Sequence, residues 1–158
     1  NEIMAYSYYK MFKLNFVFMR FFTVYGPWGR PDMSLYKFTK NIINNKKIDV
    51  YNNGKHLRDF TYIDDIVSGI HKLVLKKNNG HKIFNIGNNK KVNLMNMIHM
   101  LERHLNKKAK INFLPMQPGD IYQTQSSTRK LENYVNYKSK TEINTGIKNF
   151  VDWFLSPP

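Results

Sequence analysis

The segment NFVFMRFFTVYGPWGRPDMS, residues 15–34, joins a run of apolar residues to a loop rich in glycine and proline. Asn15–Phe22 is apolar on both of its alternating faces and is broken only by Arg20, a pattern typical of a strand buried on both sides within a parallel sheet. Val24–Asp32 then carries two glycines and two prolines, which predicts a loop. Asp32 stands where it could cap a helix that begins at Ser34. Together these features indicate an α/β fold, because parallel strands are usually joined by helices that cover the sheet.

Helical and extended segments alternate on both sides of this stretch. Helices are predicted where apolar residues recur every three or four positions, and strands where short apolar runs end in turn-forming residues. The expected helices are residues 2–13, 34–44, 64–77, 93–104, 128–134 and 141–154, and the expected strands are residues 15–22, 48–51, 58–62, 82–86 and 111–114. Asn93 is predicted to cap its helix. The alternation supports the α/β class.

The composition excludes several classes of site. The chain has 158 residues, of which 42% are hydrophobic and 15% aromatic, enough for one folded unit with a buried core. It has no cysteine, which rules out disulfides, cysteine-ligated zinc, iron–sulfur clusters and thiol chemistry. Its apolar runs are short, so no membrane span is expected. The five histidines lack metal-binding spacing, so we expect them at the surface or partly buried, and we expect no metal site.

The net charge of +14 raises the question of nucleic-acid binding. Lysine outnumbers arginine by 20 to 5, whereas bidentate recognition of phosphate and guanine favours arginine. The lysines are scattered in pairs such as Lys46-Lys47 and Lys90-Lys91. We therefore expect a solvated basic surface with a general attraction for anionic ligands and no nucleic-acid partner; a basic nucleic-acid-binding module remains the alternative from another functional class.

The sequence lacks a glycine-rich nucleotide-binding loop, but it carries a possible catalytic pair of tyrosine and lysine at four places. The eight glycines form neither a G-x-G-x-x-G dinucleotide loop nor a phosphate-binding P-loop. The pattern Tyr-x-x-x-Lys occurs four times, and on a helix its spacing places a phenol beside an ammonium that could lower the pKa of the phenol. With 10 tyrosines and 20 lysines, chance matches are expected, so we assign none of the four a catalytic role.

Three segments resemble the nucleotide-sugar epimerases of the extended short-chain dehydrogenase/reductase family, and most closely the NAD-dependent UDP-glucuronate 4-epimerases. They are residues 20–33, the run IDVYNNG at residues 48–54 and the run RDFTYIDD at residues 58–65. Weaker matches follow in the family's order at residues 84–88, 116–120 and 141–154. The resemblance implies the C-terminal part of a Rossmann-type fold, with the last strands of its sheet and a small α/β substrate-binding domain.

The resemblance also implies a division of the chain. Residues 1–30, with residues 63–88 returning to them, would end the NAD-binding domain, and residues 31–62 and 89–158 would form the nucleotide-sugar-binding domain. In the family, the catalytic Tyr-x-x-x-Lys ends shortly before an Asn-Glu pair, which here is Asn1-Glu2. We therefore expect the catalytic tyrosine and lysine upstream of Asn1, NAD bound mainly by a missing N-terminal half, and no activity in the fragment alone.

Six residues match substrate-binding positions of the family. Arg58 would bind the diphosphate, Tyr51 would pack on the uridine and Asp120 would bond the ribose hydroxyls. Thr23 would leave room for a sugar C6 carboxylate, which Arg30 could approach. The sixth residue, Ser34, begins a helix near the uracil.

Four of these positions also have a structural alternative. Arg58 could form a salt bridge with Asp59 or Asp64, Tyr51 could be a core or surface residue, Asp120 could belong to a turn, and Arg30 could simply close its loop. Phe21 and Phe22 would lie beside the nicotinamide of NAD.

The reaction implied by the resemblance is the interconversion of UDP-glucuronate and UDP-galacturonate at C4 through a 4-keto intermediate. Another UDP-sugar epimerase, a dehydratase or a decarboxylase of the same superfamily remains open. The resemblance further implies a UDP-sugar as partner and a homodimer for the full-length protein. Together with the absence of cysteine, it suggests a cytoplasmic enzyme without a membrane partner.

Overall fold

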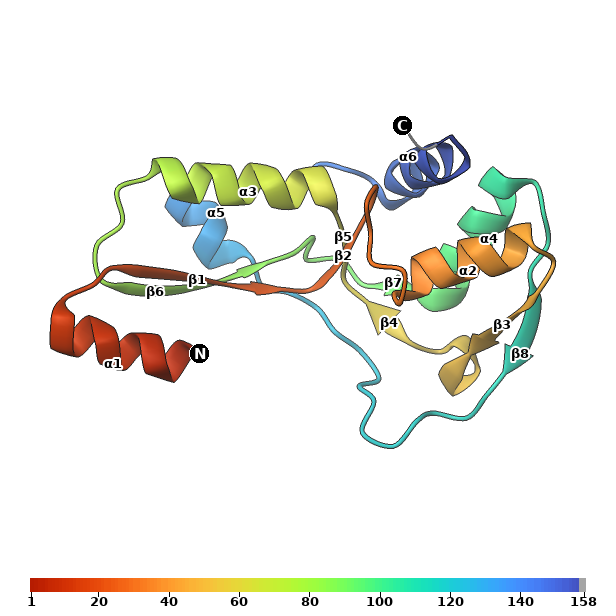
Figure 1. Ribbon diagram of the computed structural model, residues 1–158, viewed down its shortest axis with the longest axis horizontal. Helices are drawn as coiled ribbons and strands as arrows, with labels where there is room; N and C mark the ends of the chain where they lie inside the picture. The colour runs from red at the N-terminus through yellow and green to blue at the C-terminus, as the bar shows by residue number, and fades with distance from the viewer. Residues whose placement is uncertain (157–158) are drawn as a thin grey trace.

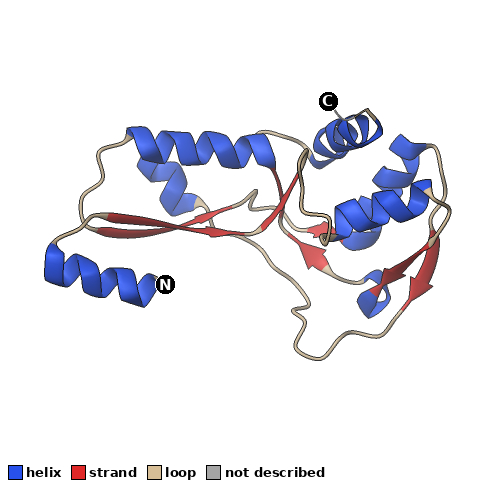
Figure 2. Cartoon of the chain, in the orientation of Figure 1, coloured by secondary structure: helices blue, strands red, loops and turns tan. Residues whose placement is uncertain are grey.

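Helices and short strands alternate along the chain in the computed structural model, which describes residues 1–156 (Figures 1 and 2). The helices are α1 (Glu2–Phe12), α2 (Ser34–Ile43), α3 (Ile63–Leu75), α4 (Leu94–Leu105), α5 (Arg129–Val135) and α6 (Ile143–Leu155). The strands are β1 (Phe16–Phe21), β2 (Thr23–Tyr25), β3 (Lys47–Val50), β4 (Leu57–Arg58), β5 (Phe60–Tyr62), β6 (His81–Ile86), β7 (Val92–Asn93) and β8 (Lys110–Phe113). The predicted α/β class is confirmed.

The strands pair two by two, and most of the pairs are parallel. β1 pairs with β6, β2 with β5 and β3 with β8 in parallel, whereas β4 and β7 are antiparallel. The register of β2 and β5 sets Thr23 opposite Phe60. This pairing brings the start of β2 next to the segment that carries Arg58.

One half of the molecule is built on β1 and β6. α3 and α5 cover one side of this strand pair, and α1 lies on the other side (Figure 1). Phe84 and Ile86 of β6 pack with Ile66 of α3 and Leu131 of α5 in a buried cluster. α5 therefore packs against residues 63–88, although it lies in the range 89–158 that was assigned to the other domain. The proposed division into two domains stays a prediction.

The other half holds a second core between α2, α4, α6 and β3. Its most buried residues include Ile42, Ile48, Met97 and Phe150, each no more than 1% exposed. α6 approaches β2 closely at Gly146, where an added Cβ would lie 2.1 Å from the Tyr25 hydroxyl. Glycine at this position therefore allows α6 to close over the core.

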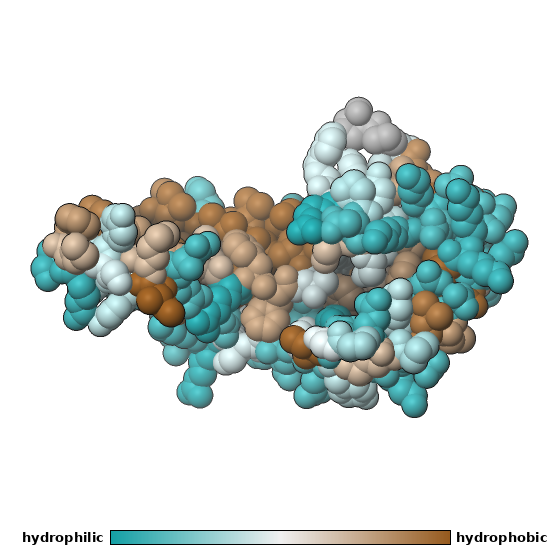
Figure 3. All heavy atoms as spheres, turned by 60° about the horizontal axis from the view of Figure 1, so that its bottom comes forward, coloured by the Kyte–Doolittle hydropathy of each residue, from teal (hydrophilic) through white to brown (hydrophobic). Residues whose placement is uncertain are grey.

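The strand predicted at Asn15–Phe22 differs from the expectation in its burial. β1 is half-buried to exposed, and Phe21 is 49% exposed. Apolar surface also gathers over the half of the molecule that holds α1 and β1, including Met11 and Phe12 (Figure 3). The expectation of burial on both faces was wrong for this structure because, among residues 1–156, β1 pairs with β6 alone.

The loop predicted at Val24–Asp32 begins later than expected. Val24 and Tyr25 extend β2, because they pair in register with Thr61 and Tyr62. The irregular loop therefore starts at Gly26.

The two predicted helix caps had different outcomes. Asn93 caps α4, and its Oδ1 accepts a hydrogen bond of 2.8 Å from the Met95 amide. Asp32 does not cap α2: the capping position is Met33, and the Asp32 carboxylate forms an ion pair with Arg30. The ion pair holds the carboxylate within the loop. No helix within the described part of the chain is both long and apolar enough to cross a membrane.

Candidate functional site

A cavity of about 230 Å³ opens between β2, the start of α2 and the end of β3. Five of the six predicted substrate-binding residues line it: Thr23, Ser34, Tyr51, Arg58 and Asp120. They come from five segments that span almost 100 positions of the sequence, so their meeting results from the fold.

Four of these residues stand at the end or start of an element, whereas Asp120 lies in the loop between β8 and α5. Thr23 opens β2, and Ser34 is the first residue of α2. Tyr51 follows β3 and starts a short 3₁₀ turn, Tyr51–Gly54, in which Asn52 and Asn53 have positive φ angles. Side chains at such positions can line the cavity while the neighbouring helices and strands keep their regular hydrogen bonds.

Arg58 is held by the long loop between β8 and α5. Its Nη2 donates to Asp120 Oδ1 at 3.0 Å, and its Nη1 donates to the carbonyl of Tyr122 at 3.1 Å and to that of Leu57 at 3.2 Å. Arg58 does not form the alternative salt bridge with Asp59 or Asp64. Its ion-pair partner in the structure is Asp120. The cavity thus contains both a fork-shaped cation and its counter-ion.

His56 is a cavity residue that the sequence did not reveal. We expected the histidines at the surface or partly buried, but His56 is only 4% exposed. Its Nε2 lies 3.1 Å from Asp120 Oδ2. Burial, followed by the charge of Arg58, lowers the pKa of His56, and the Asp120 carboxylate opposes this shift; the net effect favours the neutral ring. The sequence did contain a signal for this position: side chains alternate in an extended segment, so His56 and Arg58 should lie on the same side.

Asp49 is a second cavity residue that the sequence analysis missed. It alternates with the buried Ile48 and Val50 along β3, and its Oδ1 accepts a hydrogen bond of 2.8 Å from Asn112 Nδ2. This position puts a fixed carboxylate beside Tyr51. The period of two along the strand could have indicated that Asp49 and Tyr51 share a side.

Arg30 does not line this cavity. Its guanidinium makes a two-pronged ion pair with Asp32, with Nε 3.0 Å from Oδ1, and its side chain is 75% exposed. Arg30 borders a smaller neighbouring hollow together with Thr23 and Ser34. It therefore lies next to the five convergent residues, and its predicted contact with a sugar carboxylate stays a prediction.

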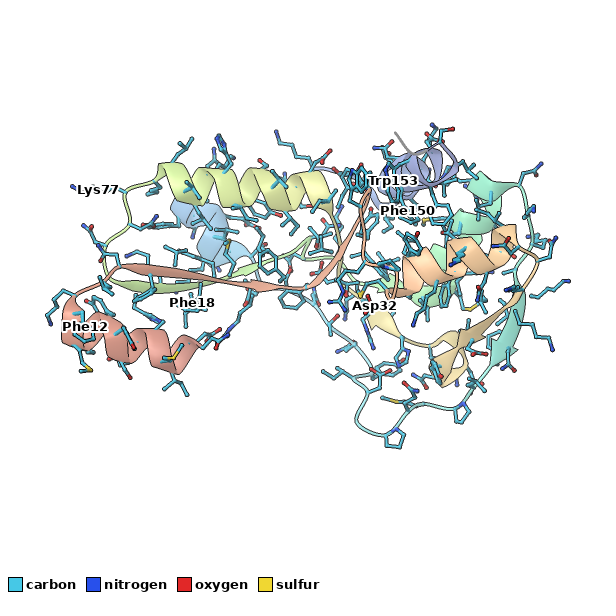
Figure 4. The ribbon with its side chains drawn as sticks, in the orientation of Figure 1. Phe12, Phe18, Asp32, Lys77, Phe150 and Trp153 are labelled. Carbon is cyan, nitrogen blue, oxygen red and sulfur yellow. The ribbon has the colours of Figure 1, made fainter. Side chains whose placement is uncertain are left out.

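Phe22 and Phe21 also lie outside the cavity. Phe22 lines a separate apolar hollow of about 330 Å³ with Pro27, Trp28 and Ile63. Trp28 packs against Trp153 of α6, and their ring centroids are 5.5 Å apart. Figure 4 shows Trp153 on α6 near Phe150 of the second core. The hollow at the end of β1 is therefore lined mainly by apolar side chains.

The described residues offer no metal site: within residues 1–156, no three histidine, aspartate or glutamate side chains are grouped to hold an ion. The chemistry available in the cavity is therefore that of a guanidinium, carboxylates, a neutral imidazole, hydroxyls and one aromatic ring.

The family model described as the NAD dependent epimerase/dehydratase family matches residues 1–87, more than half of the chain. The chain belongs to this family. The family resemblance expected from the three sequence segments is thereby confirmed.

Relatives in this family cover the chain almost completely. "Uncharacterized protein MJ1055" of Methanocaldococcus jannaschii is 50% identical over 98% of this chain and 47% of its own length. The "Probable UDP-glucuronate 4-epimerase" of Rhizobium meliloti is 37% identical over 97% of this chain and 50% of its own length. The chain thus spans about half the length of the curated relatives it matches.

A solved structure of the family has the same fold. It is the UDP-glucuronic acid 4-epimerase of Bacillus cereus in complex with UDP-glucuronic acid and NAD, which is 33% identical and has a TM-score of 0.92 over 98% of this chain and 49% of its own chain. The predicted Rossmann-type architecture of an epimerase is confirmed by this similarity.

Proposed function

We propose that this chain forms the nucleotide-sugar-binding part of an NAD-dependent epimerase that interconverts UDP-glucuronate and UDP-galacturonate at C4. The observation that carries the proposal is the convergence of five distant residues on one cavity beside Arg58. The similarity to UDP-glucuronate 4-epimerases at 33% and 37% identity supports it. Among the members of the family, it favours an epimerase over a dehydratase or decarboxylase.

The polar residues of the cavity suit the nucleotide half of such a substrate. The guanidinium of Arg58 is planar and can donate to two phosphate oxygens, and such charge-assisted bonds are stronger than neutral ones. The Asp120 carboxylate is an acceptor for ribose hydroxyls. Ser34 opens α2, where a hydroxyl and free backbone N–H groups face the space that we assign to the uracil.

The sugar half would extend from the cavity towards the loop that follows β2. Thr23 lines both the main cavity and the smaller hollow beside Arg30, so it lies where the two spaces meet. Its small hydroxyl leaves room for a C6 carboxylate. Arg30 would bind that carboxylate by exchanging its partner Asp32 for the ligand.

The residues of this chain could contact the nicotinamide ring of a dinucleotide but not hold its pyrophosphate. The apolar hollow lined by Phe22 suits the face of a flat ring, with Phe21 exposed nearby, but the sequence has no glycine-rich loop for a pyrophosphate. A dinucleotide bound beside this hollow would supply reversible hydride transfer at C4 of the sugar. The share of this chain is to hold the sugar nucleotide against that ring.

Product analysis tests the proposal. The complete native protein that contains these residues, supplied with UDP-glucuronate and NAD, should form UDP-galacturonate of unchanged mass, whereas the 158 residues alone should form none. A product that has lost water or carbon dioxide would indicate the dehydratase or decarboxylase.

Retention on heparin with a steep salt dependence, without a response to UDP, would favour nucleic-acid binding. Sedimentation of the complete protein tests the proposed homodimer, and fractionation of cells tests the proposed cytoplasmic location.

Replacing Tyr51 with alanine should weaken UDP binding by about 5- to 30-fold, because base stacking on an aromatic ring contributes about 1–2 kcal/mol. Tyr51→Phe keeps the ring and should bind within about twofold of wild type. Calorimetric titration of UDP into the complete protein measures both. Tyr8→Ala, which removes an exposed ring of α1, is the matched control and should bind normally. Full affinity in Tyr51→Ala would mean that the uracil lies elsewhere.

A further inference from the structure

The buried ring of His56 has an unusual environment. Its side chain is 6% exposed, and its Nε2 makes no aligned hydrogen bond to any residue that the structure describes, although Asp120 Oδ2 is only 3.1 Å away. A buried polar nitrogen without an aligned partner is destabilising, and native proteins rarely leave one without a reason.

The carboxylate next to His56 is already occupied on its other oxygen. Asp120 Oδ1 accepts from Arg58 Nη2 at 3.0 Å and from the Ile121 amide at 2.7 Å. The Asp120 side chain is 31% exposed, that of Arg58 19% and that of His56 6%, so the three groups form a series from the cavity mouth into its wall. A small rotation of the carboxyl group would align Oδ2 with the imidazole.

We propose that His56 is a positioning residue. When the ligand's diphosphate displaces the Asp120 carboxylate from Arg58, His56 forms a hydrogen bond to that carboxylate. The inference rests on the proposed function, because it requires a nucleotide diphosphate in this cavity. Phosphate oxygens compete with Asp120 for the same guanidinium, and their negative charge repels the carboxylate. The N–H of a neutral His56, with its proton on Nε2, then donates to Oδ2 and keeps Asp120 beside the ribose hydroxyls.

The geometry explains why a histidine suits this position. Arg58 is also held by the carbonyls of Leu57 and Tyr122, so it stays in place when Asp120 leaves it. Asp120, by contrast, lies in the long loop after β8. Among residues 1–156, its carboxylate has the Ile121 amide besides its two side-chain neighbours, and its own amide donates to the Gln117 carbonyl. His56 is the more buried of these two neighbours, and its Nε2 is 3.1 Å from Oδ2, so it can fix the orientation of the released carboxylate.

Calorimetric titration of UDP into the complete native protein tests the proposal. His56→Leu should weaken binding by about tenfold, since it removes a hydrogen bond to a charged group. His56→Gln should restore affinity to within about threefold of wild type, because its side-chain N–H has a similar reach. In an Asp120→Ala background, which leaves no acceptor for the imidazole N–H, His56→Leu should have little further effect. His99→Leu, which changes an exposed histidine of α4, is the matched control.

A second measurement needs no variant to fold. In wild-type protein labelled with ¹⁵N-histidine, UDP should move the His56 Nε2 resonance towards that of a hydrogen-bonded N–H, while the His99 resonance stays unchanged. Normal UDP affinity in His56→Leu, equal losses in the leucine and glutamine variants, or an unmoved resonance would each overturn the inference and leave the proposed function intact. Failure of the wild type to bind UDP would overturn the proposed function and this inference with it.

Discussion

Replacing Asp59 with alanine should lower the free energy of unfolding by about 3–5 kcal/mol, since it removes a buried acceptor shared by several donors. Asp59 is fully buried. Its carboxylate accepts from the amides of Asn88, Asn89 and Ser126 at 2.8–3.0 Å, and from the hydroxyls of Ser126 at 2.6 Å and Thr61 at 3.3 Å. It thus connects the strand region around β5, the turn after β6 and the loop before α5.

The size of the effect follows from the donors that would lose their acceptor. In Asp59→Ala, the Asn89 amide keeps the Ser126 hydroxyl at 3.0 Å, but the amides of Asn88 and Ser126 lose their bonds to the carboxylate. Each unsatisfied buried group costs about 1–3 kcal/mol. Asp59→Asn keeps one acceptor oxygen and should lie between the alanine variant and wild type.

Urea unfolding of the complete protein measures this loss. Asp152→Ala is the matched control, because Asp152 pairs with Lys148 at 2.6 Å on the exposed face of α6, where such pairs contribute less than about 1 kcal/mol. A loss in Asp59→Ala no larger than in Asp152→Ala would show that water replaces the carboxylate.

Arg58→Ala should weaken UDP binding about 30- to 150-fold, which corresponds to about 2–3 kcal/mol for a charge-assisted contact with the diphosphate. Arg58→Lys should recover only part of the affinity, because a point charge cannot bond two oxygens as a fork does. The affinity for NAD should hardly change, since the dinucleotide loop is not formed by these residues. UDP and NAD titrations by calorimetry measure both effects.

The matched control for Arg58 is Arg103→Ala, which removes an exposed guanidinium from the last turn of α4. It should leave UDP binding unchanged. Thermal melts separate an effect on binding from an effect on folding, because Arg58 also donates to the backbone carbonyls of Leu57 and Tyr122. Equal UDP affinities in wild type, Arg58→Ala and Arg58→Lys would mean that Arg58 is structural and that the diphosphate binds elsewhere.

Much of the fold could be predicted because it depends on local patterns. The apolar spacing within α3, α4 and α6 indicated each of these helices, and Asn93 marked the start of α4. The two-residue strands β4 and β7 are too short to produce a pattern of their own. The exposure of β1 depends on how many strands pair with it, which its own residues do not specify.

Five residues of the cavity could be predicted from the sequence, but His56 and Asp49 were missed, and the contacts between the lining residues could not be predicted. The family resemblance indicated Arg58 and Asp120 separately, yet their ion pair joins positions 62 residues apart. His56 is buried because the loop around Gln123 runs beside Leu57, through bonds from the Leu57 amide to Tyr122 and from the Thr124 amide to Leu57. The sequence around His56 contains nothing that predicts the position of that loop. The roles of the cavity residues in binding stay predictions.

Neighbouring positions of one extended segment carry out unrelated tasks in this molecule. Arg58 points into the cavity, while the next residue, Asp59, points into the interior and holds three segments together. A strand reverses every side chain when it slips by one position, so an insertion or deletion here would bury the guanidinium and turn the carboxylate outward. The proposed ligand contact of Arg58 and the buried network of Asp59 therefore depend on the same register, so we expect changes in length to be tolerated less here than in the surface loops.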